Sequence, residues 1–355
     1  MRPHNLLIPF ILAFLVCSAF GSESLPEREI PITLLFEFDK RNPKPNQSFT
    51  FAARRYLDTD HKRCVYVLDK ENHRVLKYTE DGTFITQIGS IGKNAPDLYY
   101  PTAIRISGDH LYIVDGGIWI KKYTLDGQFV SRIESRRPRE IIDCLDVEQG
   151  RVFVNLRKIS DDFNRHKLIT VFDSSGKKVA EFGDVLSCLN IYAFRVFNRT
   201  SFSIVDGNLI GTFVSPPVIF RHTTSGKKIY QKDLRELGLD VIRRITEEAV
   251  CMNIYDTPER QISPEGHIRS ANYCRGFDVD EKSEAYYAVG GELEIPPVIY
   301  RFDRQGMPRE SIKLKLGIND VAAVGIFINR GLKTRYGVGH VLEGDTAFKP
   351  FFFKF

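Results

Sequence analysis

Histidines are the residues of this sequence best suited to hold a metal or move a proton. The eight are His4, His61, His73, His110, His166, His222, His267 and His340. No HxH or HExxH pair occurs, so a zinc site would need side chains brought together from distant segments. The sequence also lacks a GxSxG nucleophile elbow and a Gly-rich phosphate loop. We therefore predict no catalytic residue and no cofactor, and a zinc or calcium ion stays an open alternative.

Two arginines share a register that suggests an anion site. Arg195 and Arg275 each stand two residues before a phenylalanine, on segments that we expect to be innermost strands. Asp143 and Asp320 lie near the starts of two other such strands. Guanidinium groups hold anions in bidentate fashion, so the two arginines could bind a small anion. The alternative is that they form salt bridges with the aspartates.

Proline pairs recur at one position of two repeated segments. Pro216 and Pro217 precede Val-Ile-Phe-Arg, and Pro296 and Pro297 precede Val-Ile-Tyr-Arg. Such pre-ordered loops lose little entropy on contact and suit a binding rim. They could equally serve only to stiffen long loops.

The composition is that of an ordinary globular protein. The 355 residues are 43% hydrophobic and 27% charged, with a net charge of +5. Because Lys and Arg are spread along the chain, there is no dense basic stripe for nucleic acid, and we predict no nucleic-acid partner.

The N-terminus is typical of an export signal. Arg2 precedes the apolar run Leu6–Val16, and Ala19 and Gly21 suit cleavage before Ser22. The run is short for a membrane span, and no later stretch qualifies. We predict a signal peptide at residues 1–21 and an exported, periplasmic or extracellular protein. A lipid anchor at Cys17 is disfavoured, because the preceding Val16 is not small.

The mature sequence retains five cysteines, Cys64, Cys144, Cys188, Cys251 and Cys274. An odd number does not suit a closed disulfide framework, and no CxxC motif occurs. Cys64, Cys144 and Cys274 stand beside apolar strand residues, so we interpret them as small buried hydrophobes.

A repeated turn organises the sequence. An aromatic residue or histidine stands four positions before a glycine in five places. The copies run from Tyr78 to Gly82, Tyr123 to Gly127, Phe172 to Gly176, His222 to Gly226 and Phe302 to Gly306. The glycines are spaced 45, 49, 50 and 80 residues apart. A period of about 40 to 50 residues with several strands per unit is typical of β-propeller blades.

Each unit is predicted to hold four short strands. The expected innermost strands are Phe49–Ala53, Ala103–Ile106, Ile141–Val147, Ala193–Phe197 and Cys274–Val279. The long spacing is explained by an insertion at about 232–262 with helical apolar periodicity. The last unit lacks one strand, which Ile32–Phe38 supplies beside Phe351–Phe355. We therefore predict an all-β fold over residues 22–355, a six-bladed propeller of four-stranded antiparallel blades, closed by the N-terminal strand and carrying one helical insertion.

The first unit resembles an NHL repeat. The matching residues are Asp69, Asn72, His73, Arg74, Val75, Tyr78, Asp81 and Gly82. The second unit keeps its strands and Asp126-Gly127 but has Gly-Gly-Ile-Trp in place of Asn-His-Arg. The mature chain is similar to exported bacterial six-bladed β-propellers with diverged NHL-like repeats. Asn72, His73 and Arg74 could contact a ligand, or serve turn geometry with Arg74 paired to Asp69.

The resemblance implies a fold and leaves several functions open, because such propellers include protein-binding scaffolds, RNA binders, lyases and hydrolases. We predict a non-catalytic scaffold that binds a protein, peptide or glycan on one face of the disc. The alternative is a hydrolase or lyase with a metal at the centre of the channel.

Overall fold

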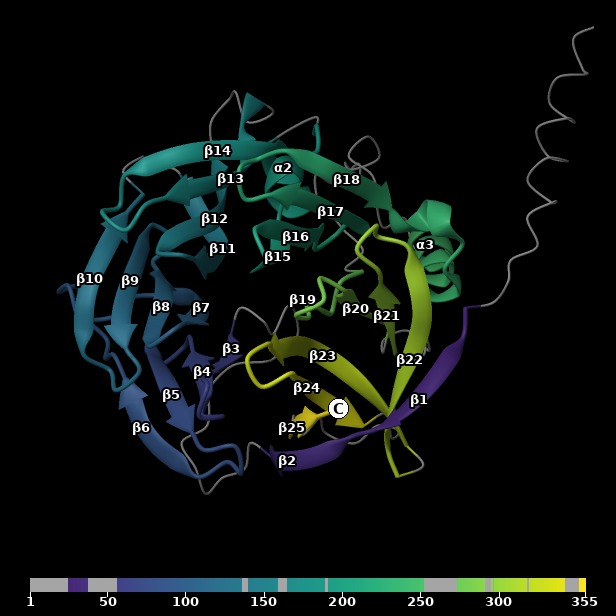
Figure 1. Cartoon of the computed structure of the whole chain (residues 1–355), viewed down its shortest axis with the longest axis horizontal. Helices are drawn as coiled ribbons and strands as arrows, with labels where there is room; N and C mark the ends of the chain where they lie inside the picture. The colour runs from purple at the N-terminus through teal and green to yellow at the C-terminus, as the bar shows by residue number, and fades with distance from the viewer. Residues whose placement is uncertain are drawn as a thin grey trace, which may run out of the picture.

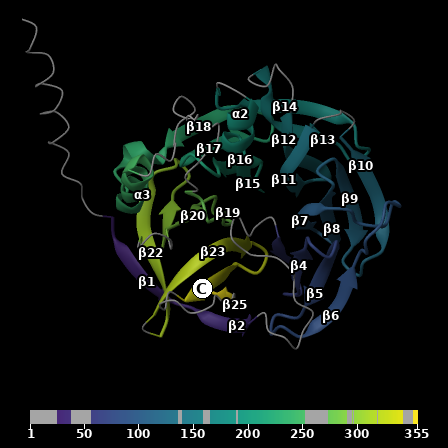
Figure 2. The same cartoon turned by 180° about the vertical axis from the view of Figure 1, so that it is seen from behind.

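The structure of the protein is a computed structural model that describes residues 25–37, 56–135, 140–158, 165–188, 191–251, 273–290, 295, 297–317, 319–341 and 351–355. Its strands form six blades around a common axis, as Figure 1 shows and Figure 2 repeats from behind. The predicted six-bladed β-propeller is confirmed. The predicted signal peptide, Cys17, the strand Phe49–Ala53 and Pro296 lie outside the described residues.

The four-stranded blades follow one another along the chain. Blade 1 is β3 (Leu57–Thr59), β4 (Val65–Asp69), β5 (Arg74–Tyr78) and β6 (Phe84–Ile88). Blade 2 is β7 (Pro101–Ser107), β8 (His110–Asp115), β9 (Trp119–Thr124) and β10 (Phe129–Glu134). Blade 3 is β11 (Glu140–Glu148), β12 (Arg151–Lys158), β13 (Lys167–Phe172) and β14 (Lys178–Asp184). Blade 4 is β15 (Thr200–Val205), β16 (Asn208–Phe213), β17 (Val218–Thr223) and β18 (Lys228–Asp233). Blade 5 is β19 (Gly276–Val279), β20 (Ala285–Val289), β21 (Val298–Phe302) and β22 (Pro308–Leu316).

The sixth blade joins the two ends of the described chain. It consists of β23 (Asn319–Asn329), β24 (Thr334–Val341), β25 (Phe351–Lys354) and the N-terminal strand β2 (Thr33–Glu37), which is antiparallel to β25. The predicted closure by the N-terminal strand is therefore confirmed. A further strand, β1 (Glu27–Pro31), runs parallel to the outer strand of blade 5. The N-terminal segment thus covers the outer edges of two blades.

The innermost strand of blade 4 is not where the sequence predicted it. Residues 191–197 form the helix α2 (Ile191–Phe197), and the inner strand is β15. Ala193, Phe194 and Phe197 are buried on this helix. The segment is short and mostly apolar, which suits a strand as well as a helix and explains the error. The true strand was missed because Thr200, Ser201 and Ser203 make it look polar, although all three are buried.

The predicted helical insertion is confirmed as far as it is described. A 3-10 helix, η3 (Leu234–Leu237), is capped by Asp233 and is followed by α3 (Asp240–Cys251). Leu234 and Ile242 pack in the same apolar cluster as blade 5 residues, and Tyr300 accepts a hydrogen bond at its hydroxyl from Val241 N at 3.2 Å. The helix is therefore attached to the outside of blade 5. Residues 252–262 lie outside the described part.

Apolar clusters between neighbouring blades make up the core. Three of the cysteines, Cys144, Cys188 and Cys274, are buried within the fold, and Cys64 is half-buried. This agrees with the interpretation of Cys144 and Cys274 as small core residues. No helix in the described ranges is long and apolar enough to cross a membrane.

Candidate functional site

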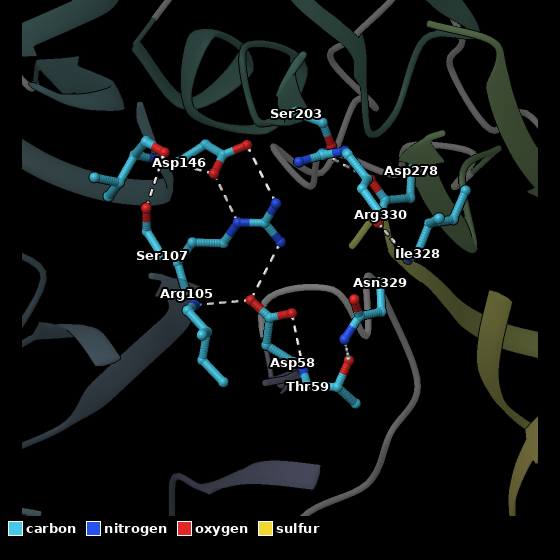
Figure 3. A network of polar contacts seen from close by, with 12 residues as sticks. Asp58, Thr59, Arg105, Ser107, Asp146, Ser203, Asp278, Ile328, Asn329 and Arg330 are labelled. Atoms are coloured by element: carbon cyan, nitrogen blue, oxygen red, sulfur yellow. Dashed lines mark hydrogen bonds and ion pairs between the residues drawn. The ribbon is translucent and has the colours of Figure 1, made fainter. Parts of the chain in front are cut away.

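Three buried aspartates on alternate inner strands join neighbouring blades. They are Asp58 on β3, Asp146 on β11 and Asp278 on β19, and we call them the aspartate ring. One oxygen of each accepts a hydrogen bond from the next residue's backbone N–H. The other accepts one from the next blade's inner strand, as Figure 3 shows for Asp278 and Ile328. These inter-blade donors are Ile106 at 2.8 Å, Ile204 at 2.7 Å and Ile328 at 2.7 Å.

Two arginines lie against the aspartate ring. Arg105 donates from Nε to Asp146 at 2.6 Å and from Nη1 to Asp58 at 3.2 Å. Burial lowers the pKa of Arg105, but these two carboxylates more than offset it, and the net effect is a raised pKa. Arg330 Nη2 lies 3.6 Å from Asp278, is buried and makes no hydrogen bond within the described structure. Burial, and then repulsion by Arg105, lower the pKa of Arg330 to about 10.

The aspartate ring has a structural role, because its carboxylates already accept hydrogen bonds from backbone N–H groups and pair with arginines. These contacts hold neighbouring blades together. Sequence reasoning missed it, although an apolar–Asp–β-branched triplet marks each member. The triplets are Leu57-Asp58-Thr59, Leu145-Asp146-Val147 and Phe277-Asp278-Val279. No group of three His, Cys, Asp or Glu side chains among the described residues could hold a metal ion. The zinc or calcium left open by the sequence has no candidate ligand set in this part of the chain.

The charged residues predicted to line the channel have different surroundings from those expected. Arg157 on β12 was not predicted, yet it donates to Asp143 (Nη2–Oδ1 3.0 Å) and to the backbone carbonyl of Arg195. Arg195 lies on α2, so its placement on an inner strand in register with Arg275 is wrong. Arg275 is buried just before β19, and Asp320 on β23 pairs with β22. Anion binding by these residues stays a prediction.

The first proline pair is packed inside the fold. Pro216 and Pro217 are buried, and their carbonyls accept hydrogen bonds from Val218 N at 2.8 Å and Leu234 N at 2.7 Å. Pro297 is also buried. These prolines stiffen their loops and offer little surface to a partner, so their part in a binding rim stays a prediction.

The NHL-like motif of blade 1 builds a rigid turn between β4 and β5. Asp69 is fully buried and accepts hydrogen bonds from Asn72 Nδ2 at 2.9 Å and Arg74 Nε at 2.8 Å. The predicted pairing of Arg74 with Asp69 is confirmed. His73 carries the left-handed backbone of the turn, with φ of 54°. Asp81 and Gly82 form the next turn, where Gly82 has φ of 87° and its N–H donates to a carbonyl at 3.1 Å.

Beside this turn lies a group of side chains, which we call the tyrosine surface: the half-buried ring of His73, the exposed rings of Tyr99 and Tyr100, and the exposed Lys93. The ring centroids of His73 and Tyr99 are 5.8 Å apart and stacked, and Tyr100 meets both edge-on at 5.2 and 5.0 Å. Lys93 Nζ lies 5.9 Å from the centre of the Tyr99 ring. Tyr99 is 45% and Tyr100 53% exposed. The sequence analysis missed both tyrosines, whose only signal is a Tyr-Tyr pair before a proline.

The tyrosine surface is held in place by its backbone. Tyr100 N donates to His73 Nδ1 at 2.9 Å, and Tyr99 N donates to Asp115 at 2.6 Å. Tyr100 has φ of 61°, which is unusual for a bulky residue, and the proline that follows disfavours helical backbone there. Strained backbone at an exposed residue is a feature of binding sites. The β4–β5 turn and the β6–β7 link emerge on the same face, because successive antiparallel strands alternate in direction.

The blade architecture agrees with a family comparison. A family model, DUF5128, described as a 6-bladed beta-propeller, matches residues 57–240. The chain belongs to this family of six-bladed propellers. No curated protein matches the sequence.

Solved structures share the fold at low sequence identity. A Bacteroides fragilis protein, provisionally described as exported, is 11% identical with a TM-score of 0.58, covering 94% of this chain and 99% of its own. A calcium-binding protein, regucalcin, from Agrobacterium tumefaciens is 10% identical with a TM-score of 0.51, covering 92% and 94%. A DUF4221 member from Bacteroides vulgatus is 10% identical with a TM-score of 0.50, covering 91% and 96%. At these identities the likeness shows the fold alone.

Proposed function

We propose that this protein is a non-catalytic, exported β-propeller scaffold that binds a partner on the face of the disc carrying the tyrosine surface. The partner classes are a protein, a peptide or a glycan, and the geometry favours a protein segment or peptide. The diverged NHL-like repeat of blade 1 is part of this proposal, because its turn supplies His73 and supports the neighbouring tyrosines.

The exposed rings of the tyrosine surface carry the proposal. Tyrosine is enriched in protein interfaces, where it adds large contact area and a polar tip at a low cost in side-chain entropy. The Tyr99 ring is stacked with His73 and has Lys93 Nζ 5.9 Å from its centre, so its faces are already partly engaged within the chain. The exposed hydroxyls and ring edges suit the polar groups of a peptide.

The fixed backbone of the tyrosine surface also supports a binding role. The hydrogen bonds to Tyr99 N and Tyr100 N fix the two residues before any partner arrives. A partner therefore gains contact area without first ordering a loop.

Export through residues 1–21 belongs to the proposal as well. It is supported by the apolar run Leu6–Val16 followed by small residues, and by the provisional description of the Bacteroides fragilis protein of the same fold as exported. Expression of the full chain followed by N-terminal sequencing of the secreted protein checks the cleavage before Ser22.

The test of the binding face is a selection against the purified protein. A random peptide library and a glycan array are each screened with wild type and with the double variant Tyr99→Ala/Tyr100→Ala. We expect peptides that bind the wild type and lose at least tenfold in affinity for the variant, because anchor tyrosines typically contribute about 2 kcal/mol. Val179→Ala is the matched control, since Val179 is 49% exposed on the outer strand β14.

Two results would contradict the proposal. Peptides that bind the double variant as tightly as the wild type would place recognition elsewhere. If glycans bind through the tyrosines and no peptide does, the partner is a glycan and the peptide proposal is wrong.

A further inference from the structure

A cavity of about 400 Å³ lies where blade 3 meets blade 2. Its walls come from the end of β10, the start of β11, and the strands β12, β13 and β14. A volume of this size is within the range of small-molecule sites. It is separate from the tyrosine surface, none of whose residues lines it.

The cavity coincides with a departure from the repeat. In the third strand of blades 1 to 5, the residue two positions before the aromatic residue or histidine of the turn is buried. The counterparts are Leu76 in blade 1, Lys121 in blade 2, Phe220 in blade 4 and Tyr300 in blade 5. In blade 3 this residue is Thr170, which lines the cavity. The smallest side chain of the series therefore stands where the space opens.

The larger counterparts fill the same interface elsewhere. Phe220 packs in one apolar cluster with Phe182 of blade 3, and Tyr300 packs with Ile219 of blade 4. In blade 3 the small Thr170 leaves this wall of the cavity less filled than in the other blades, and the open space is of a size that small ligands occupy.

The lining combines apolar walls with a buried acid. Leu156 and Phe172 are each 5% exposed and supply the walls. Glu140 is 6% exposed, and its carboxylate accepts a hydrogen bond from Ser135 Oγ at 2.9 Å. Lys177 and Lys178 also line the cavity, but both are exposed, and Lys178 pairs with Glu181 at 2.9 Å. No cationic side chain of the described residues pairs with Glu140, although burying a carboxylate without a cation is costly. Glu134 adds a second carboxylate where the cavity meets solvent.

We propose that this cavity binds a small organic cation, a primary amine attached to an apolar ring or chain. The ammonium group pairs with Glu140, and the apolar part lies against Leu156 and Phe172. Thr170 makes the room for it. This is a second site, independent of partner binding at the tyrosine surface.

The experiment measures binding of 2-phenylethylamine by calorimetry to the purified protein at neutral pH. 2-Phenylethanol and 3-phenylpropionate serve as neutral and anionic comparators of similar size. We expect the amine to bind at least tenfold more tightly than either comparator, since a charge-assisted hydrogen bond to a buried acid is lost in both.

Thr170→Leu adds bulk to the cavity wall and should weaken binding of the amine by at least tenfold. The variant should fold, because Thr170 is paired with Val154 as Leu76 is paired with Val67 in blade 1. Glu140→Gln keeps the shape and should weaken the amine by at least tenfold while leaving the alcohol unchanged. Thr86→Leu, on the outer strand of blade 1, is the control for the substitution itself.

Three outcomes would overturn the proposal. One is a wild type that binds none of the probes, and a second is an amine that binds no better than the alcohol. The third is amine binding that survives Thr170→Leu in a variant whose melting temperature matches the wild type.

Discussion

Asp146→Ala tests the structural role assigned to the aspartate ring. The carboxylate accepts from Arg105 Nε at 2.6 Å, Val147 N at 2.8 Å and Ile204 N at 2.7 Å. Its removal leaves Arg105 paired only with Asp58, and the N–H groups of Val147 and Ile204 lose this partner. Breaking a buried ion pair from one side costs about 3–5 kcal/mol, and an unsatisfied buried N–H costs about 1–3 kcal/mol. Because water can enter the space left, we expect a net loss of about 4 kcal/mol.

The loss can be measured as a change in melting temperature. For a chain of 355 residues, the entropy of unfolding is about 0.7 kcal/mol/K, so the expected decrease is roughly 5 to 6 °C. Differential scanning calorimetry of the wild type and the variant gives this value directly. Arg243→Ala is the control, because Arg243 is an exposed residue of α3 whose ion pairs should contribute less than about 1 kcal/mol.

A double-mutant cycle makes the reasoning refutable. Arg105→Met combined with Asp146→Ala should cost less than the sum of the two single changes, because the unpaired buried charge is gone. Strict additivity, or a decrease of less than about 1 °C for Asp146→Ala, would show that the aspartate ring does not hold the blades together.

Two further predictions concern single positions in the core. His222 is 2% exposed, and its Nδ1 has no hydrogen-bond partner among the described residues. Burial, and then repulsion by Lys228, lower the pKa of His222 in the folded protein. The free energy of unfolding should therefore decline as the pH falls below about 6.5, the pKa of histidine in the unfolded chain. His222→Phe should therefore melt higher than the wild type by an amount that grows from pH 7 to pH 5 in thermal scans, and an unchanged difference would contradict this. Gly276→Ala should cost about 3 kcal/mol in denaturant unfolding, because a Cβ there would lie 2.7 Å from Ile326 N on the next blade. Gly331→Ala, whose nearest contact is 3.6 Å, should change stability by less than about 0.5 kcal/mol, and equal losses for the two would refute the packing argument.

The sequence predicted the blades because their turns repeat at a nearly constant period and require glycine. Gly82, for example, has φ of 87°, which few other residues adopt without strain. The closing strand was predictable because its apolar run had no partner nearby. The α2 helix was not, since its seven residues are apolar enough for either structure and only the tertiary packing of Phe194 and Phe197 decides between them.

The candidate sites were harder to predict from the sequence because they depend on contacts between blades. The aspartate ring is formed by residues 88 and 132 positions apart, and each member is a single Asp within an apolar strand. The tyrosine surface joins His73 to a pair of tyrosines that follow two strands later, after β5 and β6. Thr170 became informative only when the register of the third strands was known, because it stands out only by comparison with the larger residues at the same position of the other blades.

The position of β2 also constrains the order in which the molecule can assemble. β2 pairs with Phe351–Lys354, and β1 pairs with β22. The first two strands of the described chain therefore cannot pair until strands far along the chain have been synthesised. A chain emerging from its N-terminus keeps both strands unpaired while the blades between them form, and unpaired strands are prone to aggregation. Ring closure is thus the most non-local and the slowest contact expected of the fold. A chain that lacks Phe351–Lys354 has an open sixth blade, so the ring can close only after this strand has been made.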